Sequence, residues 1–109
     1  MSKREIKLYL NDIIEAIDKI EGYLQGLDLE TFSEDTKTVD AVMRNFSVIG
    51  EAINNLPAEL KTIHPEIPWV EINGMRNKMI HEYFGVDETI LWQTAKENLP
   101  ELKKQISKL

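Results

Sequence analysis

The chain has 109 residues, the length of one domain, and we treat residues 1–109 as a single unit. It contains no cysteine, which excludes disulfides, thiolate zinc sites and cysteine nucleophiles. Thirteen Lys and Arg residues against nineteen Asp and Glu residues give a net charge of −6, which excludes tight nucleic-acid binding through bulk phosphate attraction.

Apolar residues recur at helical spacing through the first half of the chain. The first stripe comprises Ile6, Leu10, Ile13, Ile17, Ile20 and Leu24. A loop is expected from Leu27 to Asp35, and Ser33 or Asp35 can cap the helix that follows. The second stripe comprises Val39, Val42, Phe46, Ile49, Ile53 and Leu56. Gly50 lies inside this stripe, where it is expected to permit the close approach of another helix.

Prolines divide the middle of the chain. Pro57 suits the first turn of a helix, so a short helix is predicted from Pro57 to Ile63. The segment His64–Pro68 holds two prolines three residues apart and cannot be a regular helix interior. Pro68 can open a third long helix, which is expected to run to about Tyr83 and to stop before Gly85.

The last segment predicts one more long helix, capped by Asp87 and kinked at Pro100. Its buried stripe comprises Leu91, Ala95, Leu99, Leu102, Ile106 and Leu109. The expected fold is all-α, an antiparallel up-and-down bundle of four long helices and one short one. The chain has no apolar run near the roughly 18–20 residues of a membrane span and no apolar signal core after Met1, so we expect a cytoplasmic protein.

One segment, residues 73–84, differs in composition from the rest. On a helix, Ile72, Met75, Met79 and Tyr83 form the core face, and Arg76 lies at its margin. The opposite side carries a polar ladder of Asn73, Asn77 and His81, with Phe84 beside it. An ordinary solvent face of this chain shows Glu and Lys instead, which favours a cleft or an interface here. The alternative is a surface stripe that contains a histidine by chance.

These residue types suit the cleavage of RNA without a metal ion. His81 can act as base or acid near neutral pH, and Arg76 can hold phosphate oxygens with a planar set of donors. Asn77 can orient the imidazole or bind phosphate. One chain supplies one suitable histidine, so an acid–base pair needs two subunits and a cleft on a two-fold axis. A straight helix places Arg76 and His81 about 140° apart, and Tyr83 about 200° from His81, so spacing alone leaves their cooperation open.

The pattern Arg76-Asn77-x-x-x-His81-x-Tyr83 resembles the Arg-x4-His-x-Tyr signature of the HEPN superfamily, and more closely that of the HepT-type toxin family. The resemblance extends over nearly the whole chain. Its other matching segments are Ile49–Ala52, Pro65–Trp69, Gly74–Asn77, Ile80–Asp87 and Leu99–Leu102.

This resemblance implies a helical bundle that dimerises and brings two motifs into one cleft. It implies a metal-independent ribonuclease toxin without a cofactor, paired in a type VII-like toxin–antitoxin system with a minimal nucleotidyltransferase of the MntA type. Arg76 and His81 would be the catalytic pair, with Asn77 in support. Tyr83 would be the residue to which the antitoxin adds AMP.

Two other functions stay open at this point. The chain could be a catalytically silent HEPN module that binds nucleotides or a partner protein. It could also be a purely structural bundle whose polar ladder is a dimer seam. Retained RNA in a cleavage assay would favour either of these over the ribonuclease.

Overall fold

The computed structural model describes residues 1–81 and 87–109, and for residues 79–81 it describes the backbone alone. The described residues form the helices α1 (Lys3–Leu24), α2 (Leu29–Glu34), α3 (Thr36–Asn54), α4 (Ala58–Ile63), α5 (Trp69–His81), α6 (Glu88–Glu97) and α7 (Leu99–Ser107). No strand occurs among them. None of these helices combines the length and the apolar character that crossing a bilayer requires.

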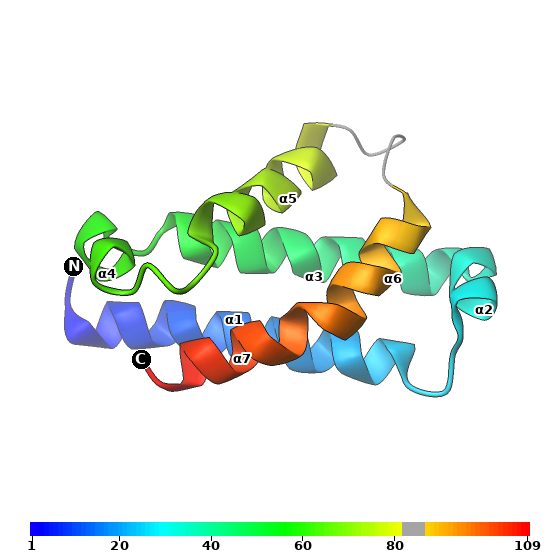
Figure 1. Cartoon of the computed structure of the whole chain (residues 1–109), viewed down its shortest axis with the longest axis horizontal. Helices are drawn as coiled ribbons and strands as arrows, with labels where there is room; N and C mark the ends of the chain where they lie inside the picture. Colours follow the sequence, from blue (N-terminus) through cyan, green and yellow to red (C-terminus); the bar gives the residue numbers. More distant parts are fainter. Residues whose placement is uncertain (82–86) are drawn as a thin grey trace.

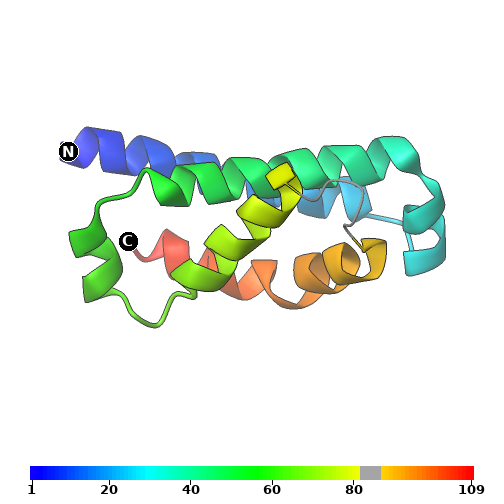
Figure 2. The same ribbon diagram turned by 90° about the horizontal axis from the view of Figure 1, so that it is seen from above.

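The long helices alternate in direction along the bundle (Figure 1). α1 and α3 lie side by side and antiparallel, α5 crosses α3, and α6 and α7 run back along α1 (Figure 2). The short helices α2 and α4 lie at opposite ends of the molecule. The predicted all-α, antiparallel up-and-down architecture is therefore confirmed.

The predicted apolar stripes form one continuous core. The side chains with no solvent exposure are Ile13, Ile17, Ile20, Phe32, Val42 and Leu91. Burying an aliphatic or aromatic side chain of this size stabilises the fold by about 1.5–3 kcal/mol relative to leaving it in water. The two ends of the stripes, Ile6 and Leu109, are only partly buried against this core.

The prediction of a loop from Leu27 to Asp35 is wrong, because this segment contains α2. The Oδ1 atom of Asp28 accepts a hydrogen bond from the Thr31 backbone at 2.8 Å, and Thr31 Oγ1 accepts one from the Asp28 backbone at 3.0 Å. This reciprocal cap starts a helix too short to show a periodic pattern. Phe32 is fully buried, with its ring centroid 5.5 Å from that of Trp92, so α2 closes one end of the core.

The last predicted helix is two helices. α6 ends at Glu97, Asn98 separates the two, and Pro100 occupies the second position of α7. Proline has no N–H to donate to the carbonyl of Lys96, four residues earlier, but it is well accommodated in the first turn of a new helix. The predicted kink at Pro100 is thus a complete break, and the buried stripe continues across it through Leu99.

Other predicted helix ends are confirmed to within a residue. Pro57 directly precedes α4, and Pro68 directly precedes α5. Asp87 caps α6, with its Oδ1 atom accepting a hydrogen bond from the Thr89 backbone at 2.7 Å. The predicted end of α5 near Tyr83 and Gly85 lies outside the described residues.

Asp35 caps α3, and its contacts there lead us to expect that the stability of the fold depends on pH. Its carboxylate accepts hydrogen bonds from the hydroxyl and the backbone of Thr38, at 2.7 and 3.1 Å, and these bonds lower the Asp35 pKa from its usual 3.8. A lowered pKa in the folded state means stability that is present above pH 3.8 and lost as the pH falls through the folded-state value.

The variant Asp35→Asn tests this prediction, because asparagine also caps helices but does not titrate in this range. We expect the melting temperature of the wild type to exceed that of the variant at pH 6. The difference should shrink as the pH falls below 3.8. A difference that stays constant from pH 6 to pH 2 would show that the Asp35 charge contributes nothing.

Candidate functional site

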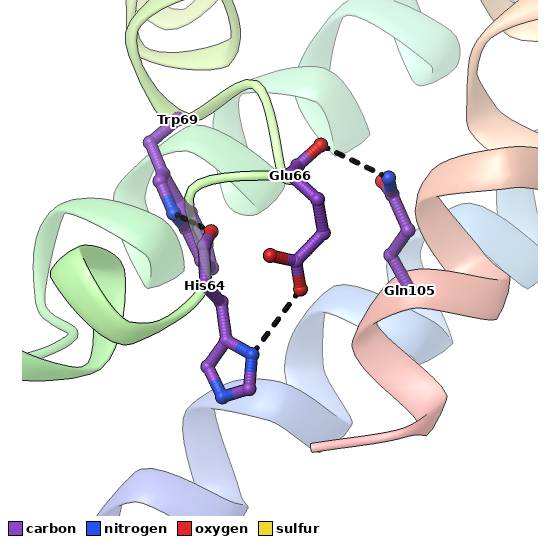
Figure 3. A network of polar contacts seen from close by, with 4 residues as sticks. All are labelled: His64, Glu66, Trp69 and Gln105. Carbon is purple, nitrogen blue, oxygen red and sulfur yellow. Dashed lines mark hydrogen bonds and ion pairs between the residues drawn. The ribbon is translucent and has the colours of Figure 1, made fainter.

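The start of α5 is fixed by a network of polar contacts with the preceding loop and with α7 (Figure 3). Trp69 Nε1 donates a hydrogen bond to the His64 carbonyl at 2.9 Å. Gln105 Nε2, on α7, donates to the Glu66 carbonyl at 3.1 Å, and the Glu66 carboxylate lies 3.2 Å from His64 Nδ1. These contacts hold the Pro-bounded loop in place and so fix the position from which α5 departs.

The inner face of α5 follows the prediction as far as its side chains are described. Ile72 and Met75 are partly buried and pack against the core. Val70, two residues before Ile72, is 81% exposed. The remaining predicted members of this face are not tested, because the Met79 side chain and Tyr83 lie outside the description.

Gly50 is a point of close approach between α3 and α5. A Cβ atom built on Gly50 would overlap the Cβ of Arg76 and lie 2.8 Å from its Cγ. Only glycine leaves room for this contact, since it has no side chain. The predicted close helix approach is confirmed, and the residue that fills the space is the candidate catalytic arginine.

Arg76 is held by contacts on both sides of its guanidinium group. Its Nε donates to Oε2 of Glu51, on α3, at 2.6 Å, and its Nη1 donates to Oδ1 of Asn77 at 3.1 Å. The Arg76 side chain is 20% exposed, against 56% for Glu51. The structure therefore brings Arg76 and Asn77 together. It adds Glu51, which the sequence analysis did not single out.

The predicted polar ladder is only partly observed. Asn77 is exposed, but Asn73 is partly buried. The Asn73 Oδ1 atom is buried and has no hydrogen-bond partner among the described residues. His81 is the last described residue of α5, and only its backbone is described. Tyr83 and Phe84 lie outside the described residues.

The described part of this site is suited to binding an anion. The contacts with Glu51 and Asn77 use two of the five guanidinium donors of Arg76. Within residues 1–81 and 87–109, no hydrogen bond or ion pair engages the other three. A partly buried guanidinium with free donors binds phosphate oxygens through short, charge-assisted hydrogen bonds.

Comparison with known proteins gives matches over nearly the whole chain. The family model "Ribonuclease HepT-like" matches residues 13–109. "Probable ribonuclease HepT" of Thermococcus cleftensis is 50% identical over 107 residues, which cover 98% of this chain and 97% of that protein. "Putative RNase MJ1216" of Methanocaldococcus jannaschii is 42% identical over 109 residues, covering 100% of this chain and 90% of that protein. No solved structure gave a significant match.

Proposed function

Because the chain belongs to the HepT-like ribonuclease family, we propose that it is an endoribonuclease that cleaves RNA without a metal ion. Arg76 and His81 are the catalytic pair, and Asn77 supports them. The observation that carries the proposal is the similarity over 98% of the chain to a protein named as a ribonuclease. The guanidinium of Arg76, which Glu51 and Asn77 hold in place, supports it, because phosphodiester cleavage needs a cation at the phosphate.

The reaction requires two proton transfers at one phosphodiester. A base removes the proton of the ribose 2′-hydroxyl, whose oxygen then forms a bond to phosphorus. The bond from phosphorus to the 5′-oxygen breaks, and an acid donates a proton to that oxygen. One imidazole serves as the base and another as the acid, while Arg76 stabilises the extra negative charge on the phosphorane. The products are a 2′,3′-cyclic phosphate and a free 5′-hydroxyl.

The need for two imidazoles implies that the active enzyme is a homodimer. The chain contains two histidines. The one other than His81 is His64, which lies in the loop before α5, where its ring contacts Glu66 in the network that fixes the start of α5. Two copies of α5 that meet on a two-fold axis would bring two Arg76 and two His81 side chains to one cleft.

We expect cleavage of RNA by the purified wild type in excess EDTA. The new ends should carry 2′,3′-cyclic phosphate and 5′-hydroxyl groups, which end-labelling and mass spectrometry identify. Cleavage that requires added Mg²⁺, or that leaves 5′-phosphate ends, would contradict the proposed chemistry.

The same proposal includes a partner that silences the enzyme. A minimal nucleotidyltransferase of the MntA type would act as antitoxin in a type VII-like pair. It would transfer AMP from ATP to the Tyr83 hydroxyl, which loses its proton, and release pyrophosphate. The added phosphate and its bulk would repel RNA beside Arg76, as phosphorylation does.

Tyr83 can be tested directly with such a partner. We expect the intact mass of the protein to rise in steps of one AMP when it is incubated with the partner and ATP. The variant Tyr83→Phe should keep its original mass. An increase that persists in this variant would place the modification elsewhere and would leave the ribonuclease proposal intact.

The competing role of a nucleotide-binding module finds little support in an apolar cavity of the described chain. This cavity of about 360 Å³ lies between α5 and α6–α7, and its apolar lining includes Phe46, Ile49, Ile72, Met75, Leu99 and Leu102. Its charged lining residues are Glu66, Glu97 and Glu101, all exposed. Three carboxylates around an apolar floor repel the phosphates of a nucleotide.

A further inference from the structure

Glu51 is the one acidic side chain that the described contacts place on Arg76. The two residues are 25 positions apart and lie on different helices, α3 and α5. Most surface ion pairs contribute little, because two flexible side chains must be ordered in high-dielectric solvent. Here one partner is already ordered, since Arg76 packs against Gly50 and is only 20% exposed.

The contact is made by the Nε atom of the guanidinium group. Glu51 Oε2 accepts from Nε at 2.6 Å, and Asn77 Oδ1 accepts from Nη1 at 3.1 Å. Two hydrogen bonds from different nitrogens of a planar group fix the orientation of its plane. Among residues 1–81 and 87–109, no contact engages the donors of Nη2 or the second donor of Nη1. A carboxylate that held both Nη atoms would instead occupy the bidentate edge that a phosphate uses.

We propose that Glu51 is a positioning residue for the cleavage reaction. Its carboxylate holds the Nε of Arg76 so that the Nη donors are aligned with the phosphate before RNA binds. This inference rests on the proposed function, because it assigns Glu51 a task that matters only if Arg76 contacts the scissile phosphate. Alignment before binding lowers the barrier, since no reorganisation of the guanidinium is needed during the reaction.

The variants Glu51→Ala and Glu51→Gln test the role, with kcat and KM measured on one RNA oligonucleotide in EDTA. We expect Glu51→Ala to lower kcat by about tenfold, because the guanidinium loses its orientation. KM should not rise, since removing one acid from a chain of net charge −6 weakens the repulsion of RNA. Glu51→Gln keeps an oxygen acceptor for Nε and should restore much of kcat.

A control with the same change of charge is Glu59→Ala, on α4, where the glutamate is exposed. It should leave kcat at the wild-type value. Thermal melting of each variant separates loss of alignment from loss of folding. Wild-type kcat in Glu51→Ala, or a kcat above the wild type, would overturn the inference.

The variant Arg76→Ala separates this inference from the proposed function. If Arg76→Ala cleaves RNA as fast as the wild type, the proposed catalytic role of Arg76 fails, and the role of Glu51 fails with it. If Arg76→Ala is inactive while Glu51→Ala keeps the wild-type kcat, only the role of Glu51 is wrong.

Discussion

We expect His81→Ala and Arg76→Ala each to lower the rate of RNA cleavage by a factor of about 10²–10⁴. A positioned acid or base contributes about this much, and a preorganised donor at the developing charge contributes about 10²–10³. The assay is cleavage of an RNA oligonucleotide in EDTA under single-turnover conditions. Thermal melting should show that both variants remain folded, and for Arg76→Ala we expect this because the Arg76 side chain is only partly buried.

The chain provides a matched control for each variant. His64→Ala changes the other histidine, and Arg4→Ala changes an exposed arginine of α1. Neither should alter the cleavage rate by more than about twofold. His64→Ala loses only the contact of its ring with the exposed Glu66 carboxylate and keeps the carbonyl that accepts from Trp69 Nε1, and Arg4 is exposed on α1. Equal cleavage by the wild type, His81→Ala and Arg76→Ala would show that the activity belongs to a contaminating nuclease.

We expect Gly50→Ala to destabilise the fold by about 1–3 kcal/mol, the usual cost of forcing an extra methyl group into a packed interface. The new Cβ would overlap the Cβ and Cγ atoms of Arg76, so α3 and α5 must move apart. The same movement displaces the guanidinium, so cleavage should fall as well. Urea unfolding followed by circular dichroism measures the first effect.

A second glycine makes the test of Gly50 sharper. Gly22, near the end of α1, has no atom within 4 Å of where its Cβ would lie. Glycine in a helix costs about 0.5–1 kcal/mol relative to alanine, so Gly22→Ala should stabilise the protein. The two substitutions are chemically identical, and their effects on the free energy of unfolding should have opposite signs. A Gly50→Ala variant as stable as the wild type would contradict the close contact between α3 and α5.

Long periodic patterns made most of the fold predictable from the sequence. Within α1 and within α3, the apolar residues of the stripe recur every three to four positions over many turns. Few structures other than a helix explain a pattern of that length. Asp35 and Asp87 were predictable as caps because each directly precedes a helical pattern. Gly50 was predictable as a contact because a glycine inside a buried stripe leaves space that another helix can use.

The features that the sequence did not reveal depend on short segments or on distant contacts. α2 has six residues, fewer than two turns, so its Leu29 and Phe32 form no visible stripe. A proline can kink one helix or stand in the first turn of a new one. The local sequence around Pro100 does not distinguish the kink that was predicted from the break at Asn98 that is observed. The partial burial of Asn73 was not predicted, because helix geometry alone placed it opposite the core.

Glu51 was not predicted for a different reason. It is one of nineteen acidic residues, and its place in the family-matching segment Ile49–Ala52, beside Gly50, did not say which side chain it contacts. Its partner Arg76 is 25 residues away in the sequence. The two side chains meet because Gly50, the residue before Glu51, lets α5 approach α3. The contact between Arg76 and Asn77 needs no such approach of two helices, since the two residues are adjacent in sequence.

The most direct test of the shared cleft is RNA cleavage by mixtures of wild-type and His81→Ala chains, refolded together at constant total concentration. If each reaction needs one His81 from each copy, only dimers of two wild-type chains are active. Activity should then fall with the square of the wild-type fraction, to about one quarter in an equal mixture. A linear fall, to about one half, would show that each chain works alone and would contradict the composite site.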